Sequence, residues 1–436
     1  MTKDLIFKKK YVYYTIKKYK MGNRKIFVQI ASYRDPELLP TIRDCIDKAK
    51  HPEMLTFGIC WQRDETESMG EFADDSRFTI LDYPWNESKG LCWARSEIQK
   101  LWKDEEYTMQ LDSHHRFLQD WDEELITMME QTGSEKPIIT AYAGMYRPSD
   151  NTLLNTEPYK MVPSNFTPGG TILFRPHHIE NWQSLTEPIP ARFVSGHFFF
   201  TWGYHCEEYK YDPNIYFAGD EISLSIRSYT LGYDLFHPHK TIVWHEYTRE
   251  GRTKHWTDFN TENKDKGLVD KPWWEMDNES KRRLRHMLQE EDNNIDLGIY
   301  GLGNVRTHHD YELYAGINFL QRKLHQDAID GKNPPVNDET EWWLQEPKDY
   351  IVSVNWDYDF LKQQSNNFSF LYLGIESEDG TVMYRKDFNP QDDGGIFSGE
   401  QTSHSVTLTT VNKPHKWVLW PVDNSGNWLN RKDVII

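Results

Sequence analysis

Apolar runs typical of buried strands alternate with amphipathic segments typical of helices from residue 26 to residue 114, and this alternation constrains the fold more than any other feature. The strand-like runs are 26–31, 55–62, 78–83 and 107–114, and the helix-like segments are 38–49 and 91–102. Strands and helices that alternate over short connections are typical of a doubly wound, mostly parallel sheet. Ligands bind at the carboxyl ends of the strands in such a sheet, so the polar residues that follow each run are candidates for function.

The pattern is less regular after residue 137 and changes again near residue 341. Further strands are predicted over 137–144, 169–176, 194–203 and 241–247, a loop entering a helix over 218–233, and a charged helix over 281–291. After residue 341, short alternating runs are separated by Asp-Gly, Asn-Pro and Ser-Gly turns. That spacing predicts a small all-β sandwich.

The sequence therefore predicts an α/β protein with a smaller all-β domain at its C-terminal end. We expect a basic N-terminal arm over 1–24, an α/β domain over 25–325, a linker over 326–340 and a β-sandwich-like accessory domain over 341–436. The length of 436 residues fits such a division, because a single hydrophobic core stops growing beyond about 250–300 residues.

Charge and cysteine content exclude several functions. The formal net charge of −18 argues against a nucleic-acid binder, because phosphate contacts need a basic surface. An acidic chain is still compatible with a nucleotide diphosphate when a metal ion supplies positive charge locally. No long apolar run is present, so no transmembrane helix is expected. The cysteines form no CxxC pair, which predicts reduced thiols in a cytoplasmic protein; they are Cys45, Cys60, Cys92 and Cys206.

Asp112 and His114 end the fourth predicted strand. Residues i and i+2 of an extended segment point the same way, so this carboxylate and this imidazole are placed to share one cation. Such a pair, with positions left open for diphosphate oxygens, suits Mn²⁺ or another divalent ion such as Mg²⁺. His245 ends the strand predicted over 241–247 and is the candidate third ligand.

The segment TREGRTKHW after His245 carries several basic residues around Gly251, namely Arg249, Arg252, Lys254 and His255. One interpretation is a lid whose cations neutralise a diphosphate, with Arg252 and Lys254 in contact with the donor. The other is a solvated basic loop, and the sequence favours neither.

Asp220 and Glu221 follow Gly219 at the expected start of a helix. The helix dipole favours carboxylates at this end, so capping explains the pair without a function. The functional interpretation makes both acids catalytic residues that face a hydroxyl of the donor sugar or of the acceptor. Asp220 is the preferred residue, because Gly219 allows the backbone to approach a ligand closely.

Candidate nucleotide-binding residues lie near the carboxyl ends of the first predicted strands. They are Gln29, Ser32, Tyr33 and Arg34 with the first strand, Asp64 after the second, and Lys89 and Arg95 around the start of the helix over 91–102. Together they offer an aromatic ring for a base and hydrogen-bond donors for ribose and phosphate. Neither GxGxxG nor GxxxxGK[ST] is present, so neither a dinucleotide fold nor a P-loop is supported.

Four blocks of sequence, IASYRDPELLPTIRDC, KGLCWARSEIQKLW, MQLDSHHRF and YGLGNVRTHHDYELYAGINF, resemble the family of cytosolic polypeptide N-acetylglucosaminyltransferases. That family includes enzymes that modify hydroxyproline on a ubiquitin-ligase subunit. The resemblance, over residues 25–325, implies a GT-A fold, a UDP-sugar donor (usually UDP-GlcNAc), a divalent metal ion and retention of anomeric configuration. It implies a metal role for Asp112, His114 and His245, and a uridine role for Ser32, Arg34 and Arg95.

A metal-dependent glycosyltransferase that acts on a hydroxyl of a protein or glycan is therefore the leading hypothesis. A nucleotide-sugar hydrolase, in which water replaces the acceptor, is the alternative enzyme. A carbohydrate-binding protein with a degenerate α/β domain is the non-enzymatic alternative, and the intact Asp112 and His114 argue against it. The β-rich and aromatic region 341–436 lies outside the resemblance, and either glycan or acceptor binding or a structural role suits it.

Overall fold

The computed structural model describes residues 24–248, 251–336, 348–364, 368–378, 380–410, 413–424 and 426–436. The described chain divides into two compact units. Unit 1 comprises residues 24–165, 172–320 and 324–336, and unit 2 comprises 166–171, 321–323 and the described residues from 348 onward. The predicted N-terminal arm lies outside the described residues except for Arg24, and the division into four segments stays a prediction.

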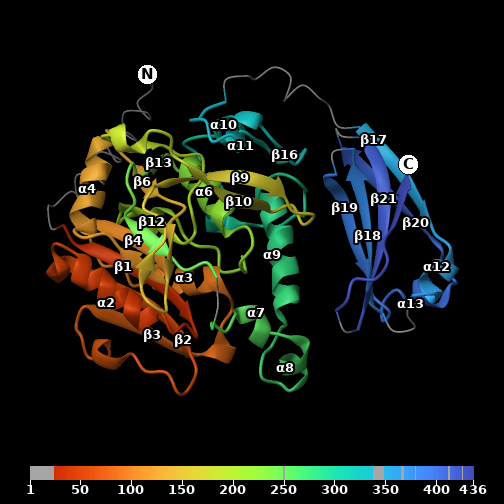
Figure 1. Ribbon diagram of the computed structural model, residues 1–436, viewed down its shortest axis with the longest axis horizontal. Helices are drawn as coiled ribbons and strands as arrows, with labels where there is room; N and C mark the ends of the chain where they lie inside the picture. The colour runs from red at the N-terminus through yellow and green to blue at the C-terminus, as the bar shows by residue number, and fades with distance from the viewer. Residues whose placement is uncertain are drawn as a thin grey trace. The chain divides into compact units, whose positions relative to one another are not determined.

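Unit 1 is built on an eight-stranded sheet with the order β11-β13-β6-β12-β4-β1-β2-β3 (Figure 1). Its strands are β1 (Ile26–Tyr33), β2 (Leu55–Arg63), β3 (Phe78–Pro84), β4 (Tyr107–Asp112), β6 (Pro137–Thr140), β11 (Ile189–Pro190), β12 (Phe198–Trp202) and β13 (Asp234–His237). The pairs β3–β2, β2–β1, β1–β4 and β6–β13 are parallel. β12 is antiparallel to both its neighbours, and β11 is antiparallel to β13. The mostly parallel α/β class predicted from the sequence is confirmed.

Helices cover both faces of this sheet. α2 (Leu38–Lys48) and α4 (Trp121–Gln131) share one buried cluster with Val28 and Ile30 of β1. α3 (Leu91–Gln99) packs on the opposite face, in a cluster that contains Phe27 and Ala31. Alternate residues of β1 thus enter different cores, which explains why the segment is apolar along most of its length.

Parallel pairing brings the carboxyl ends of β1, β2 and β4 to the same edge of the sheet. Ala31 pairs with Cys60 on one side and with Asp112 on the other. The chain leaves β1 through Arg34, whose backbone adopts the left-handed conformation with a φ of 46°. The polar residues that follow these strands therefore meet at one edge, where open α/β sheets bind their ligands.

A second sheet, with the order β5-β14-β7-β8, begins just after β4. Its strands are β5 (His115–Phe117), β7 (Gly144–Arg147), β8 (Thr152–Leu153) and β14 (Val243–His245). The strand predicted over 241–247 forms as β14 and belongs to this second sheet. β14 is antiparallel to β5 with His245 opposite His115, and this register brings His245 to the end of β4.

The remaining elements up to residue 336 are mostly short. They are β9 (Tyr159–Phe166), β10 (Ile172–His178), β15 (Ile317–Asn318), β16 (Lys323–Leu324), α5 (His205–Glu208), α6 (Asp220–Thr230), α7 (His255–Asp258), α8 (Thr261–Asp265), α9 (Trp273–Met287), α10 (His308–Ala315) and α11 (Gln326–Ile329). α9 begins earlier than the helix predicted over 281–291, because its buried face includes the polar Asp277 and Ser280, which apolar periodicity does not reveal. Among the described helices, none is long and apolar enough to cross a membrane.

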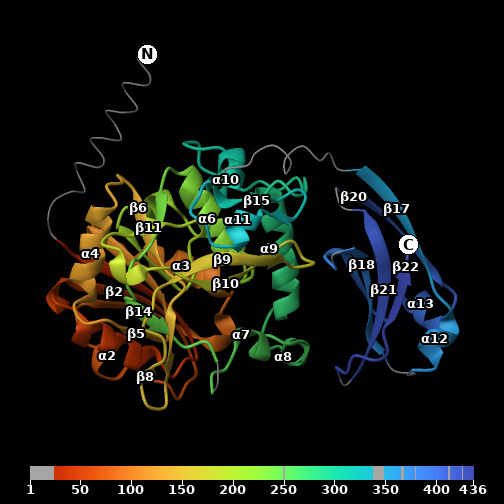
Figure 2. The ribbon, with the colours of Figure 1, turned by 45° about the horizontal axis from the view of Figure 1, so that its top comes forward.

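Unit 2 contains two antiparallel sheets from residue 348 onward. One pairs β17 (Lys348–Asn355) with β20 (Ser403–Thr410), and the other has the order β19 (Val382–Phe388), β18 (Phe368–Ser377), β21 (Pro414–Asp423) and β22 (Lys432–Ile435). Figure 2 shows these strands in blue, together with α12 (Tyr358–Lys362) and α13 (Gly394–Ser398). One buried cluster joins Val352 and Val406 of the first sheet to Leu373 and Leu419 of the second. The sheets therefore pack face to face, and the predicted all-β character is confirmed.

Gly219 is required by both backbone geometry and packing. Its φ of 94° lies in the left-handed region that side chains other than glycine rarely adopt. A Cβ there would come within 2.3 Å of Cδ2 of Leu284, a fully buried side chain of α9. The close approach that the sequence suggested at Gly219 is therefore to a neighbouring helix rather than to a ligand.

We expect Gly219→Ala to lower the free energy of unfolding by about 2–5 kcal/mol, because left-handed strain of about 1–2 kcal/mol adds to overpacking of about 1–3 kcal/mol. Gly267→Ala is the matched control, since Gly267 has a φ of 70° but a Cβ added there would meet no atom within 4 Å. Urea unfolding of both variants separates strain from packing. Equal losses would show that the contact with Leu284 contributes nothing.

Candidate metal and donor site

A pocket of about 170 Å³ opens at the carboxyl edge of the main sheet. Its walls come from the residues after β1 and β4, the start of α3, the end of β14 and the segment around α7. Six residues predicted from the sequence line it: Tyr33, Asp112, His114, His245, Arg252 and Lys254.

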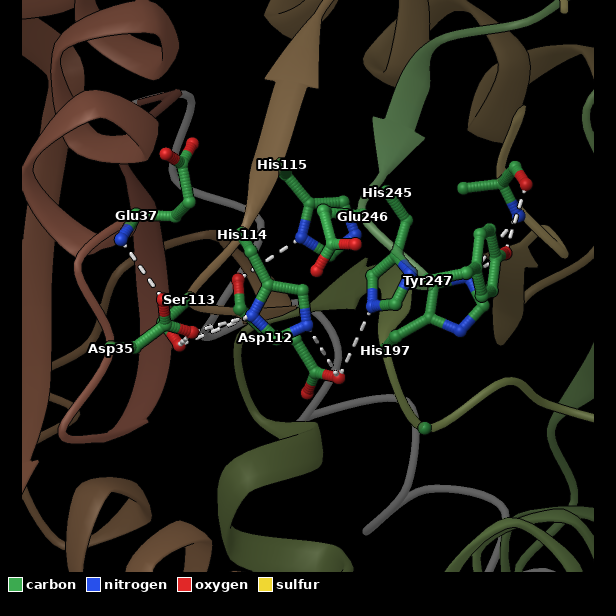
Figure 3. A network of polar contacts seen from close by, with 12 residues as sticks. Asp35, Glu37, Asp112, Ser113, His114, His115, His197, His245, Glu246 and Tyr247 are labelled. Carbon is green, nitrogen blue, oxygen red and sulfur yellow. Dashed lines mark hydrogen bonds and ion pairs between the residues drawn. The ribbon is translucent and has the colours of Figure 1, made fainter. Parts of the chain in front are cut away.

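Asp112, His114 and His245 converge on one wall of this pocket (Figure 3). Each offers one ligand atom, and the three atoms lie within 4.8 Å of one another. Oδ2 of Asp112 is 3.5 Å from Nε2 of His245 and 3.9 Å from Nε2 of His114. Bonds of about 2.0–2.2 Å to a shared divalent ion are compatible with these separations. The structure thus brings together the three residues that the sequence nominated as metal ligands.

The chemistry of these side chains fits a divalent ion. One carboxylate oxygen with two imidazole nitrogens suits Mn²⁺ and similar ions. Nδ1 of the buried His245 has no hydrogen-bond partner among the described residues, and its Nε2 has only Oδ2 of Asp112, at the long distance of 3.5 Å. Buried polar atoms usually have partners, so an imidazole left in this state points to a ligand outside the chain. Asp112, His114 and His245 would hold such an ion.

Asp35 orients His114, and the sequence analysis did not single it out. Its Oδ2 accepts a hydrogen bond from Nδ1 of His114 at 2.7 Å, which leaves the lone pair of the ring on Nε2, on the side of Asp112 (Figure 3). Burial raises the pKa of Asp35, but the hydrogen bond from His114 and the charge of Arg252 outweigh it and hold the pKa below its usual value. Carboxylates in this position fix the tautomer of metal-binding histidines. The available signal was its place directly after the first strand.

Two further histidines that the sequence analysis missed, His115 and His197, surround His245. Their ring centroids lie 4.9 and 4.6 Å from that of His245. Burial lowers the pKa of all three well below the usual value, so the rings are neutral, as metal ligation requires. Nδ1 of His115 donates to the backbone oxygen of Asp112 at 3.0 Å, which fixes the end of β4.

Arg95 is buried behind the pocket and does not line it. Its guanidinium pairs with Oδ1 of Asp112 at 2.9 Å and with Asp220, and donates to the backbone oxygen of Gly196 at 2.6 Å. Only 2% of its side chain is exposed. The nucleotide-binding role predicted for Arg95 stays a prediction that the structure does not favour, because its donors serve two carboxylates inside the protein. Its place in the structure is to position Asp112.

Asp220 and Glu221 belong to the same buried network. Asp220 contacts Arg95, and Oε1 of Glu221 accepts a hydrogen bond from the backbone nitrogen of Gly196 at 3.1 Å. Neither acid is among the residues that line the pocket. The preference for Asp220 as the acid facing the sugars loses its basis, because that carboxylate neutralises Arg95 and the nearby Gly219 packs on a helix.

Tyr33 and Arg34 share a carboxylate partner on α7. The hydroxyl of Tyr33 and Nη1 of Arg34 both donate to Oδ2 of Asp258 at 2.8 Å. Nη2 of Arg34 pairs with Asp64 at 3.1 Å. Tyr33 lines the pocket, whereas Arg34 and Asp64 neutralise each other beside it. These contacts join the segment after β14 to the ends of β1 and β2.

Three other predicted nucleotide-binding residues do not line the pocket. Gln29 is buried in the middle of β1, where its amide donates to a threonine hydroxyl of β4 at 2.8 Å. Ser32 is buried and, by strand alternation, faces away from the side on which Tyr33 lines the pocket. Lys89 is exposed and is not part of the lining. The sequence placed these residues together because they are close to the strand ends. Their side chains point in different directions, so they do not share one site.

A chain of hydrogen bonds that the sequence did not reveal fixes another wall. The hydroxyl of Tyr216 donates to Nδ1 of His255 at 2.8 Å, and Nε2 of His255 donates to the hydroxyl of Ser88 at 3.0 Å. That hydroxyl donates to the side-chain oxygen of Gln62. Burial lowers the pKa of His255 to about 3, so the neutral ring accepts on one side and donates on the other. The chain ties α7 to the ends of β2 and β3.

Arg252 lies beside the candidate metal ligands. Its Nη1 lies against the His114 ring, 2.5 Å from Nδ1 and 2.8 Å from Nε2, and 3.2 Å from Oδ2 of Asp35, while Nη2 pairs with the buried Glu246 at 2.7 Å. Lys254 adds a second cation to the pocket wall. Residues 249–250, including Arg249, lie outside the described chain, so the choice between lid and solvated loop stays open.

The family model described as "Glycosyltransferase (GlcNAc)" matches residues 25–77 and 71–321. This match covers more than half of the chain, and the protein belongs to that glycosyltransferase family. The sequence prediction of a glycosyltransferase is therefore confirmed at the level of the family, which does not resolve the hydroxyproline-modifying type.

Two solved structures show a distant likeness. A crystal structure of GalNAc-T7 with UDP, GalNAc and Mn²⁺ is 14% identical, with a TM-score of 0.42, and the match covers 66% of this chain and 54% of that one. A crystal structure of S. aureus TarS 1-349 is 10% identical, with a TM-score of 0.34, and the match covers 51% of this chain and 60% of that one. The chain thus spans about half the length of the first and three-fifths of the second. No curated protein matches the sequence.

We expect Asp35→Asn to weaken Mn²⁺ binding by about 10–100-fold, because loss of the carboxylate lowers the basicity of His114 and loosens its orientation. Asn keeps the size of the side chain and an oxygen that can accept from Nδ1. Isothermal titration of the full-length protein with MnCl2 measures the change. Asp64→Asn, a carboxylate that lies beside the pocket without lining it, is the control, and equal losses in both variants would refute the orienting role.

Burial raises the pKa of Glu221 to about 7, with a further contribution from the Asp220 charge. The folded state therefore binds this proton more tightly than the unfolded chain, and the carboxyl lowers stability as pH rises from about 4.5 to about 7. We expect Glu221→Gln, which cannot ionise, to gain roughly 1–3 kcal/mol of stability relative to wild type between pH 5 and pH 8. Urea unfolding at the two pH values measures this gain. A pH-independent difference would mean that the carboxyl titrates normally.

Proposed function

We propose that the protein is a GT-A glycosyltransferase that uses a divalent ion, Mn²⁺ in the first place, to transfer GlcNAc from UDP-GlcNAc to a hydroxyl of a protein or glycan. The observation that carries this proposal is the convergence of Asp112, His114 and His245 on the pocket at the carboxyl edge of the sheet. Membership of the glycosyltransferase family supports sugar transfer. The carboxylate oxygen and the two imidazole nitrogens of the candidate site support the binding of a divalent ion.

The side chains behind the ligands prepare this site. When bound by Asp112, His114 and His245, a divalent ion supplies positive charge that stabilises a departing nucleotide diphosphate. Asp35 directs Nε2 of His114 toward the site, and Arg95 holds the opposite oxygen of Asp112. Ligand atoms that are fixed in advance lose little entropy on binding, so these partners favour a well-defined site.

The pocket wall also suits the rest of the donor. Lys254 provides a cation for phosphate oxygens in a chain whose net charge is −18, and Arg252, whose charge Asp35 and Glu246 balance, offers hydrogen-bond donors. Tyr33 and His255 present aromatic rings whose centroids lie 4.9 Å apart, and we propose that one of them packs against the uracil base.

The acidic pair has a positioning role in this proposal. Asp220 pairs with Arg95 directly, and Glu221 holds Gly196, whose carbonyl accepts a hydrogen bond from Arg95. Both acids therefore act on Asp112 through Arg95 rather than by touching a sugar. The position of both acids in the first turn of α6 also agrees with the helix-dipole interpretation, and the direct catalytic role stays a prediction.

Retention of anomeric configuration and a polypeptide acceptor, including hydroxyproline, follow from the resemblance to the polypeptide N-acetylglucosaminyltransferases. The four cysteines are unpaired and buried, which agrees with the proposed cytoplasmic location, since thiols stay reduced there.

We expect Asp112→Asn to reduce Mn²⁺-dependent UDP release from UDP-GlcNAc by more than about a hundredfold, because loss of an outer partner of a metal ligand already costs about 10–100-fold. Asn keeps the size of the side chain and an oxygen for Arg95, which favours folding. UDP release is measured with and without MnCl2, and circular dichroism checks the fold. Asp150→Asn, at an exposed carboxylate that pairs with Arg147 and does not line the pocket, should stay within about threefold of wild type, a difference below 1 kcal/mol.

The same assay separates transferase from hydrolase. UDP release that rises with an added peptide or glycan acceptor supports transfer, whereas release that no acceptor changes indicates a nucleotide-sugar hydrolase. Full activity in a folded D112N protein would contradict the metal assignment. A panel of UDP-GlcNAc, UDP-GalNAc, UDP-Glc and UDP-Gal identifies the donor.

A further inference from the structure

One face of the four-stranded sheet in unit 2 is turned away from the core of that unit. Leu371, Leu373 and Ile375 of β18 belong to the buried cluster between the two sheets. Successive side chains of a strand point to opposite faces, so Tyr372 and Gly374 lie on the outer face. This outer face, which includes residues of β19, β21 and β22, is called the platform below.

Two aromatic rings lie side by side on the platform. Tyr372 of β18 is the register partner of Trp420 of β21. A Cβ on Gly374 would come within 2.5 Å of the Tyr372 hydroxyl, so the glycine makes room for the tyrosine ring to lie along its own strand. Arg385 of β19 lies over the same ring, 5.1 Å from its centroid. The tyrosine is thereby held flat on the sheet.

Trp428 extends this aromatic surface from the connection between β21 and β22. Its ring centroid is 4.5 Å from Trp420, 5.6 Å from Phe370 and 6.1 Å from Tyr372. The side chain is 47% exposed, whereas apolar rings of this size are usually covered in a folded domain. Arg431 lies over Trp420, 5.4 Å from the ring centroid.

Paired charges surround the rings. Three cations and three carboxylates of the platform form ion pairs between 2.5 and 3.4 Å: Arg385 with Asp387, Lys416 and Arg431 with Glu376, and both again with Asp433. The formal charge of this set is zero. Its guanidinium and carboxylate groups still offer hydrogen-bond donors and acceptors at the rim of an apolar surface.

We propose that the platform is a binding site for a neutral oligosaccharide, separate from the donor pocket. A sugar ring has one C–H face that packs on a flat aromatic ring, and hydroxyls at its edge that bond to planar charged groups. The exposed ring of Trp428, which is tilted by 54° to the ring of Trp420, supplies the stacking surface, and Tyr372, only 8% exposed, packs behind it. The Arg385–Asp387 and Arg431–Asp433 pairs supply the edge contacts.

The balance of charges on the platform favours a neutral oligosaccharide over a charged ligand. A nucleic acid or a sulfated glycan needs an excess of unpaired cations, and every cation of the platform is paired with a carboxylate. A protein partner generally covers a larger apolar area than one exposed tryptophan provides. A short neutral sugar chain matches both the size and the polarity of the surface.

The test is calorimetric titration of the full-length protein with chitotriose, cellotriose, mannotriose and lactose, and with a heparin tetrasaccharide as the charged comparison. We expect at least one neutral sugar to bind, and Trp428→Ala to weaken it by about tenfold or more, as for a central aromatic contact. Trp428→Phe, which keeps a flat ring, should restore most of the affinity. Trp274→Ala is the matched control, because Trp274 on α9 is 44% exposed but lies outside the platform.

Two further measurements distinguish sugar binding at the platform from the chemistry of the donor pocket. Asp112→Asn should bind the same sugar with unchanged affinity, and Trp428→Ala should release UDP at the wild-type rate. Failure of sugar transfer would therefore leave this result intact. The proposal is overturned if no neutral oligosaccharide binds, if Trp428→Ala and Trp274→Ala bind equally well, or if only the heparin fragment binds.

Discussion

The buried guanidinium of Arg95 is the group on which the rest of the site depends. From α3 it pairs with Asp112 at the end of β4 and with Asp220 at the start of α6. Removing one partner from a buried ion pair costs about 3–5 kcal/mol, because the other charge is left without compensation. One cation shared by two carboxylates thus holds together three elements that are far apart in the sequence. The end of β4 is positioned by this constraint before any ligand is present.

Paired charges also explain how an acidic protein can handle an anionic donor. Arg95 and Arg252 are both neutralised by carboxylates inside the protein, and Arg34 is neutralised beside the pocket. Their role is therefore to orient groups more than to create a positive field. Lys254 and a divalent ion held at Asp112 are left to supply the positive field. The residues that bind the ion therefore matter more for binding an anionic nucleotide sugar than the number of basic residues does.

The periodic pattern of apolar residues was sufficient to predict the strands near the N-terminal end of the chain. It was not sufficient to predict the elements further along. β1, β2 and β4 occur where continuous apolar runs predicted them, because central parallel strands are buried on both faces, and the partly buried edge strand β3 also forms where it was predicted. α9 was misplaced because its buried face carries Asp277 and Ser280, and the sequence did not predict the sheet to which β14 belongs. The strands that pair with a short strand are decided by the whole fold. The three residues of β14 alone are too few to predict them.

The sequence by itself determined that Asp112 and His114 point the same way at the end of a strand, since side-chain direction in an extended segment follows from local geometry. Only the tertiary structure decided that His245 joins them through β14, that Asp35 orients His114, and that Arg95 is buried rather than facing a nucleotide. These contacts join residues up to 133 positions apart, from Asp112 to His245. Which distant side chains meet is set by strand order and register, and these become definite only when the complete core is packed.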